Sequence, residues 1–151
     1  MATWGEFAIA APELAAFGHE RFREIPVSML ATVREDGWPR LHPFEPIIAE
    51  GHLFVFTYRH PPKVHDLRND GRCVVHNTVI DNDGGAGEFT LRARAAAVED
   101  EAVAAVAWKA VESKGWKPDG PLICFELLVE SAFAITYADG EPSLERWPGE
   151  V

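Results

Sequence analysis

The chain has 151 residues, of which 47% are hydrophobic and 25% charged, so it is long and apolar enough for one globular domain spanning residues 1–151. Fourteen basic residues against twenty-four acidic ones give a net charge of -10, which disfavours sequence-independent binding of nucleic acid. No apolar run approaches the ~20 residues of a membrane span, and the first eighteen residues lack the pattern of a signal peptide. The two cysteines form no disulfide framework. We therefore expect a soluble cytoplasmic protein.

Positive charge is concentrated in the middle of this acidic chain. Residues 34–94 carry eight of the fourteen basic residues and nine acidic ones, whereas residues 95–151 carry four basic and eleven acidic ones. A local group of cations on a surface that otherwise repels anions is typical of an anion-binding site. Surface strands that happen to use arginine explain the same distribution, so charge alone leaves both interpretations open.

The first half of the chain predicts a helix followed by three strands. Residues 12–24 have Pro12 at a first turn and apolar positions near helical spacing. Residues 27–34, 38–49 and 52–57 are rich in strand formers and are separated by the turn signals Asp-Gly and Glu-Gly, which indicates an antiparallel meander. Three prolines in the second of these strands make it an edge, bent or bulged strand.

The second half predicts two more helices and three more strands. A short helix over 63–69 has proline before it, and the helix after Asp100 has an amphipathic pattern that ends at Gly115. Six strands and three helices, mostly antiparallel and without strict alternation, predict a mainly β protein, a β-barrel with peripheral helices. The remaining strands are expected over 72–79, 88–98 and 123–129, with 81–87 as a glycine-rich loop and 133–137 extending the last strand past a bulge.

The segment from Thr57 to Lys63 carries the strongest chemical signal. A strand ends at Thr57 and Tyr58, Arg59 follows, and Lys63 lies in the first turn of the next expected helix. Helix N-termini offer free backbone N–H groups and partial positive charge, so a phosphate would fit here with Arg59 and Lys63 neutralising it. A surface turn with two solvated cations is the alternative.

A second candidate group lies on the strand over 38–49. Arg40 and His42 are two residues apart and therefore share a face, which Phe44 continues. A guanidinium beside an imidazole and an aromatic ring suits a planar anionic ligand, although an exposed strand face explains the same pattern. Arg92 and Arg94 share a strand face in the same way, and pairing with carboxylates on a neighbouring strand is favoured for them.

Other reactive residue types give weaker signals. The six histidines include no pair at helical ligand spacing, so we expect no metal site. Cys73 and Cys124 lie in apolar strands and are expected to be core residues rather than nucleophiles. Trp38 and Trp147 are candidates for covering a ligand or a subunit contact, with ordinary hydrophobic packing as the favoured alternative.

In combination, several of these segments resemble the pyridoxamine 5'-phosphate oxidase-like family, the FMN-binding split barrels. The segments are 29–33 (MLATV), 36–39 (DGWP), 53–57 (LFVFT) and 63–72 (KVHDLRNDGR), within a match from about residue 25 to residue 98. The resemblance implies a six-stranded antiparallel split barrel that forms a homodimer, with two flavin-type cofactors in clefts between the subunits.

The resemblance also implies roles for single residues. Lys63 matches the lysine that grips the cofactor phosphate, Thr57 matches the hydroxyl at the strand end, and Arg40 lies close to the arginine of the second strand. The spacing after Gly37 is shorter than in the oxidase itself, which makes the Arg40 match approximate.

Further cofactor-binding positions follow from the same comparison. Tyr58 and Arg59 match positions that line the phosphate, and His42 lies on the stretch that faces the isoalloxazine ring. His76 and Asn77 are weaker candidates. The expected cofactor-binding set is therefore Arg40, His42, Thr57, Tyr58, Arg59 and Lys63.

Two departures from the family pattern bear on function. Pro61 stands where many members have serine two residues before the lysine, which removes a hydroxyl from the phosphate site. The chain ends ERWPGEV, without the Arg-x-His substrate motif of the true oxidase, so pyridoxamine phosphate oxidation is not expected.

We therefore expect an oxidoreductase that uses FMN or the deazaflavin F420, with an unknown small-molecule substrate and no identified catalytic acid or base. The alternative is a non-catalytic FMN- or heme-binding module of the same fold, with heme the less favoured cofactor. A relative that binds no cofactor is a third, weaker alternative, to which Pro61 gives weight.

Overall fold

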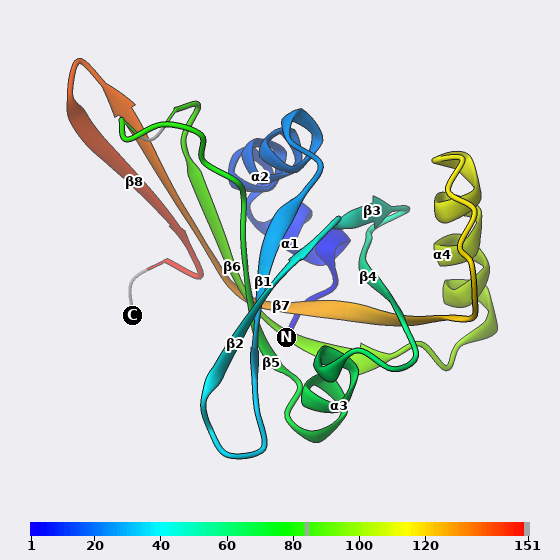
Figure 1. The fold of residues 1–151 in the computed structure, drawn as a ribbon. Helices are drawn as coiled ribbons and strands as arrows, with labels where there is room; N and C mark the ends of the chain where they lie inside the picture. Colours follow the sequence, from blue (N-terminus) through cyan, green and yellow to red (C-terminus); the bar gives the residue numbers. More distant parts are fainter. Residues whose placement is uncertain (84, 150–151) are drawn as a thin grey trace.

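The computed structural model describes residues 1–83 and 85–149, and within them it contains four helices and eight strands (Figure 1). Every neighbouring pair of strands is antiparallel, so the expectation of a mainly β antiparallel fold is confirmed. The helices are α1 (Trp4–Ala10), α2 (Pro12–Glu24), α3 (Pro62–Asn69) and α4 (Glu101–Ser113). The strands are β1 (Ser28–Val33), β2 (Pro39–Phe44), β3 (Ile47–Ala49), β4 (His52–Tyr58), β5 (Arg72–His76), β6 (Glu88–Ala97), β7 (Leu122–Ala138) and β8 (Glu141–Trp147).

The sheet is curled, because two strands that are consecutive in the chain lie at opposite ends of its order. That order is β2-β1-β5-β6-β7-β4-β3, with β8 paired to β7 outside this path. Only Glu45 and Pro46 separate the end of β2 from the start of β3, so the two ends of the sheet must lie close together in space. This is the arrangement of a barrel that is split between β2 and β3.

The expected meander of three strands is therefore wrong at its centre. The segment over 38–49 forms two strands, and β2 pairs with β1 whereas β3 pairs with β4. Pro46 lies at the break and has no backbone N–H to continue either ladder.

The structure also has two strands more than the six expected. One arises from the division at Pro46 and the other is β8, which pairs along the end of β7. The bulge expected in the last strand is present: Arg92 pairs with Ser131 and Ala93 with Val129, which leaves Glu130 as the extra residue. The sequence did not predict the helix α1, which begins after the N-cap residue Thr3, and Thr3 forms a capping box with Glu6.

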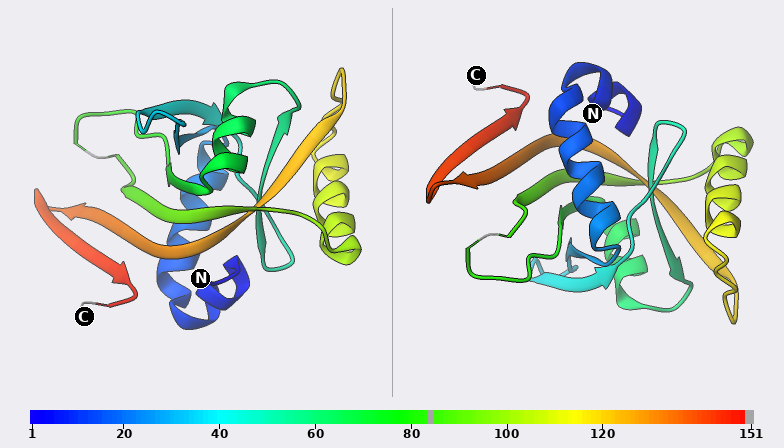
Figure 2. Two further views of the ribbon diagram at one scale, coloured as in Figure 1. Left: turned by 90° about the horizontal axis from the view of Figure 1, so that it is seen from below. Right: turned by 90° about the horizontal axis from the view of Figure 1, so that it is seen from above.

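One face of the long strands packs against the N-terminal helices. Phe89 and Leu91 of β6 are fully buried. The helix α2 contacts β6 and crosses the long strands of the sheet (Figure 2). Gly18 of α2 lies directly against Phe89, since a Cβ atom added there would lie 2.3 Å from the ring. A smaller core joins β3 and β4 to α4, which lies at the end of the molecule opposite β8 (Figures 1 and 2).

No helix in the described part of the chain combines the length and the apolar character that crossing a membrane requires.

Candidate functional site

A buried carboxylate on α3 joins the helix to strands β1 and β2. Asp66 is 1% exposed, and its Oδ2 accepts hydrogen bonds from Thr32 Oγ1 at 2.7 Å and from Arg40 Nε at 2.8 Å. Burial alone raises the pKa of Asp66, but the hydrogen bonds from Arg40 and Thr32 outweigh it and hold the pKa below its ordinary value. Arg40, one of the expected cofactor ligands, is therefore fixed in place by an ionised partner.

Lys63 and His42 lie beside this pair. Lys63 is half-buried, and burial lowers the pKa of its ammonium group. Burial lowers the pKa of His42, and the positive charges of Lys63 and Arg40 lower it further. Since the positive charges of Arg40 and Lys63 both act on the imidazole of His42, the structure brings these three residues together in one group, called the cation group below. Among the residues that the structure describes, Lys63 has no ion-pair partner.

The end of β4 divides the other expected ligands between two sides of the strand. Thr57 is 4% exposed and shares its face with Val55, which packs in the same core as Val64 of α3. Tyr58 points to the opposite face, where its ring meets Trp116 with centroids 6.3 Å apart. Arg59 is exposed on the segment between β4 and α3. Thr57 thus faces the main core, to which α3 also contributes, whereas Tyr58 points away from it.

The first turn of α3 offers fewer backbone donors than the sequence suggested. Pro62 has no N–H, and the N–H of Val64 donates to the carbonyl oxygen of Pro61 at 3.0 Å. An anion at this helix start would depend mainly on the side chains of Lys63, Arg40 and His42. Phe44, which continues the face of Arg40 and His42, is buried in the core at 7% exposure and does not line an open surface.

A hollow with aromatic walls lies on the other side of β4. Its volume is about 580 Å³, and Phe56, Trp116 and the ion pair between Glu45 and Lys114 are among the residues that line it. Trp108 of α4 packs edge-on against Phe56 with centroids 5.3 Å apart. This hollow is large enough for a planar organic group.

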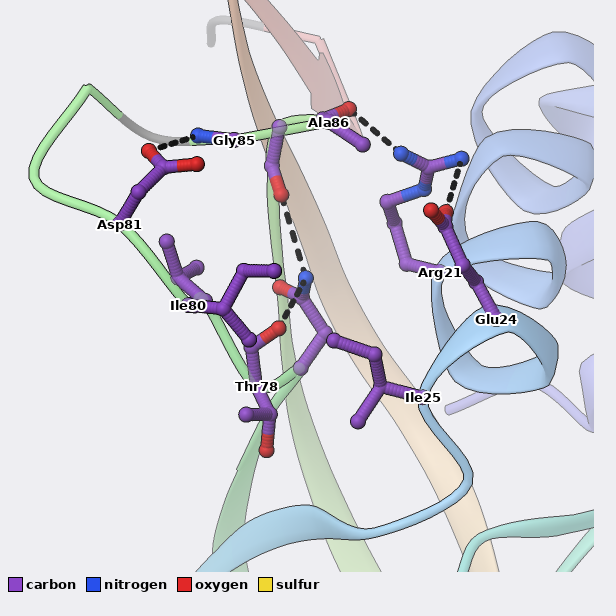
Figure 3. A pocket seen from close by; sticks show the side chains of 11 residues that line it. Arg21, Glu24, Ile25, Thr78, Ile80, Asp81, Gly85 and Ala86 are labelled. Atoms are coloured by element: carbon purple, nitrogen blue, oxygen red, sulfur yellow. Dashed lines mark hydrogen bonds and ion pairs between the residues drawn. The ribbon is translucent and has the colours of Figure 1, made fainter.

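A smaller hollow lies between α2 and the segment that follows β5 (Figure 3). Its volume is about 220 Å³, and Arg21 is the cation on its wall. Arg21 donates to the carbonyl oxygen of Ala86 at 2.6 Å and pairs with Glu24 at 3.0 Å, so these contacts already use its charge (Figure 3). Residue 84 of the expected loop over 81–87 lies outside the described residues.

A family model described as pyridoxamine 5'-phosphate oxidase matches residues 15–132, which include every residue of the cation group. The chain belongs to this oxidase family. The resemblance seen in the sequence is thereby confirmed, and the match extends through α4 and into β7. No curated protein matches the chain at a significant level.

Solved structures with a similar fold come from the same family and from proteins of different function. A protein from Clostridium acetobutylicum related to general stress protein 26 is 14% identical, with 90% of this chain and 95% of that chain covered and a TM-score of 0.63. A heme binding protein from Mycobacterium smegmatis is 19% identical, with 86% and 57% covered and a TM-score of 0.64. An F420 reductase is 16% identical, with 71% and 89% covered and a TM-score of 0.53. These similarities establish the fold alone.

Several weaker candidates have structural roles in this oxidase-family chain. The amide of Asn77 accepts from the backbone of Phe89 at 2.7 Å and donates to the carbonyl oxygen of Gly87 at 3.1 Å, so it braces the start of β6. Burial raises the pKa of both Cys73 and Cys124 to about 12, which keeps the thiols protonated at neutral pH.

Trp38 and Trp147, the two candidates for covering a ligand or a subunit contact, lie in different surroundings. Trp147 packs against Phe7 with centroids 5.1 Å apart, as expected for ordinary hydrophobic packing. Trp38, in contrast, is 70% exposed.

Sequence reasoning missed Asp66 and Thr32 as members of the site. The available signal was the spacing of α3: Asp66 lies three residues after Lys63, which places both on one side of the helix, and it stands between the apolar Val64 and Leu67. A carboxylate at a position that faces the core needs a polar partner, and here Thr32 and Arg40 provide it.

Proposed function

We propose that this protein is an oxidoreductase that binds a flavin (FMN) or the deazaflavin F420, with the anionic tail of the cofactor held by Lys63. The observation that carries the proposal is a half-buried ammonium group with no ion-pair partner among the described residues, next to a second and a third basic side chain. Removing a cation from water without a partner is costly, and a phosphate group at this position would offset that cost.

The residues present fit such an anion. Asp66 is the carboxylate of the group, but its charge is already matched by Arg40, so the ammonium group of Lys63 remains to attract an anion. Thr57 adds a hydroxyl on the same side of β4, and Arg59 follows it on the exposed segment. Pro61 supplies neither a hydroxyl nor an N–H, so the tail is held by side chains rather than by the helix start.

The bound cofactor would supply the hydride chemistry, and the protein would bind, orient and shield it. Arg40 and Lys63 fix the tail, while His42, on the strand face next to Arg40, lies toward the ring. Tyr58 packs its ring against Trp116, which lines the aromatic hollow of about 580 Å³ on the far side of β4. The fold shared with an F420 reductase and a heme binding protein agrees with a site for a large planar cofactor.

We also propose that the chain forms a homodimer through the β1–β2 hairpin. Trp38 is 70% exposed and Leu41 is 65% exposed, and both lie on or next to β2, the strand at one end of the sheet order. A second copy would cover these apolar side chains and the free edge of β2.

The cofactor is identified by the absorbance spectrum of the purified protein and the mass of the small molecule that it releases on denaturation. Reduction of the bound flavin by NAD(P)H, or transfer of hydride from reduced F420 to a substrate by the protein, supports the oxidoreductase. A flavin that no such donor reduces, or a heme, would instead support the binding module. A colourless protein that binds neither FMN nor F420 on titration would overturn the proposal.

A further inference from the structure

A third hollow opens on the face of the sheet that α1 and α2 do not cover, over strands β6, β7 and β8. Its volume is about 400 Å³, which is in the range of small-molecule sites. The lining includes two arginines, two hydroxyl side chains and two aromatic rings: Arg92, Arg146, Thr90, Ser131, Phe133 and Trp147.

Strand pairing fixes all of these side chains except that of Trp147 on one face, whereas the ring of Trp147 packs against Phe7 of α1. Thr90 and Arg92 alternate with the buried Phe89 and Leu91 and therefore point away from the core. Their partners across the ladder are Phe133 for Thr90 and Ser131 for Arg92. Arg146 of β8 lies opposite Phe133, and its guanidinium carbon is 5.0 Å from the centroid of that ring.

The two arginines of this hollow differ from most others in the chain. Six of the ten arginines pair with a carboxylate, and one of these is Arg94, which is on the same face of β6 as Arg92 and binds Glu130 at 2.8 Å. Arg92 and Arg146 have no ion pair with any residue that the structure describes. The pairing with carboxylates expected for both strand arginines is thus present at Arg94 and absent at Arg92.

Within the described part of the chain these two guanidinium groups stay without a carboxylate partner, although the net charge of the chain is -10. Both groups line one hollow, so they repel each other unless an anion lies between them. Guanidinium groups bind the oxygens of carboxylate and phosphate through paired N–H donors, and the hydroxyls of Thr90 and Ser131 can add further hydrogen bonds. Phe133 provides apolar surface beside the charged groups, and Trp147 borders the hollow.

We propose that this hollow is a second ligand site, which binds a small aromatic molecule carrying a carboxylate or a phosphate group. Arg92 and Arg146 hold the anionic group, and the ring of Phe133 packs against the aromatic part of the ligand. The site shares no residue with the cation group around Lys63, so it does not depend on the cofactor proposed there.

The test is calorimetric titration with phenyl phosphate, benzoate and inorganic phosphate. Each probe is titrated into the wild-type protein and into the Lys63→Ala variant. Binding of a phosphate at the proposed cofactor site would be lost in this variant. We expect an aromatic anion to bind to both proteins. Whichever of phenyl phosphate and benzoate binds with the higher affinity shows which anionic group the site prefers. We expect Arg92→Gln and Arg146→Gln each to weaken that binding at least tenfold.

Arg94→Gln is the matched control, because it removes a positive charge from the same strand face outside the hollow. It should change the affinity by less than twofold, whereas a loss equal to that of Arg92→Gln would show non-specific surface attraction and overturn the site. Binding that disappears in Lys63→Ala, or that is absent for every probe, would overturn it as well. Inorganic phosphate that binds as tightly as phenyl phosphate would overturn the aromatic part of the proposal.

Discussion

At the scale of single residues, Asp66 connects the candidate site to the stability of the fold. We expect Asp66→Asn to lower the free energy of unfolding by about 1.5–3 kcal/mol, since an amide loses the charged hydrogen bond to Arg40 and leaves that cation unmatched. Urea denaturation followed by circular dichroism measures the change. Glu35→Gln is the control: its ion pair with His65, at 3.3 Å, is exposed, so removing it should cost less than ~0.5 kcal/mol. If Asp66→Asn and Glu35→Gln lower the free energy of unfolding equally, Asp66 does not link α3 to β1 and β2.

His42 gives the site a pH dependence. Burial, followed by the charges of Lys63 and Arg40, holds its pKa below the ordinary value of 6.5, so the unfolded chain binds a proton at higher pH than the folded one does. The stability that this creates is present above pH 6.5 and is lost as the pH falls through the folded pKa. We expect urea midpoints to decrease on acidification below pH 6.5 less steeply in His42→Gln than in wild type. Identical slopes would contradict the placement of His42 among cations.

The members of the site differ in how visible they are in the sequence. Arg40, Thr57 and Lys63 follow from local features: a strand face, a strand end and a proline-led helix start. Asp66 of α3 could not be assigned in this way, because its importance arises from its hydrogen bonds with Thr32 of β1 and Arg40 of β2. Local spacing places Asp66 on the right side of α3 but does not show what it faces.

At the scale of elements, the contact between α2 and β6 depends on the absence of a side chain at Gly18. Alanine is normally the better helix former by about 1 kcal/mol. In this helix a Cβ would lie 2.3 Å from the Phe89 ring, so we expect Gly18→Ala to destabilise the protein by about 1–3 kcal/mol. Ala16→Gly, at an exposed position of the same helix, should cost about 1 kcal/mol through propensity alone. A stabilising Gly18→Ala in urea denaturation would show that α2 and β6 are not in close contact.

Elements with a clear local pattern could be predicted, whereas the division of the sheet into its strands depends on distant pairing. The helix α4 was predicted from its apolar spacing, and Asp100 does accept hydrogen bonds from Ala102 and Val103 at its start. The break between β2 and β3 depends on their pairing with different strands, which no local pattern shows. The strand β8 is exposed along almost its whole length, so it lacks the alternation that reveals a half-buried strand.

At the scale of the whole molecule, the exposed apolar side chains of the β1–β2 hairpin predict the proposed homodimer. Light scattering at micromolar concentration should give twice the chain mass of 16.7 kDa. Leu41→Asp should shift the particle toward the monomer, because it places a charge in the expected contact. Ile9→Asp changes a residue of α1 that is 84% exposed and should leave the mass unchanged. A wild-type particle of 16.7 kDa would contradict the dimer.

The role of Lys63 as the anchor of a phosphorylated cofactor is tested most directly by titrating FMN and F420 into wild-type, Lys63→Ala and Lys109→Ala proteins. Loss of a charged hydrogen bond worth about 1.5–3 kcal/mol should raise the Kd of the bound cofactor roughly ten- to a hundredfold in Lys63→Ala. Lys109→Ala removes an exposed lysine of α4 and should leave the Kd unchanged. An equal Kd in wild type and Lys63→Ala would contradict the proposed site.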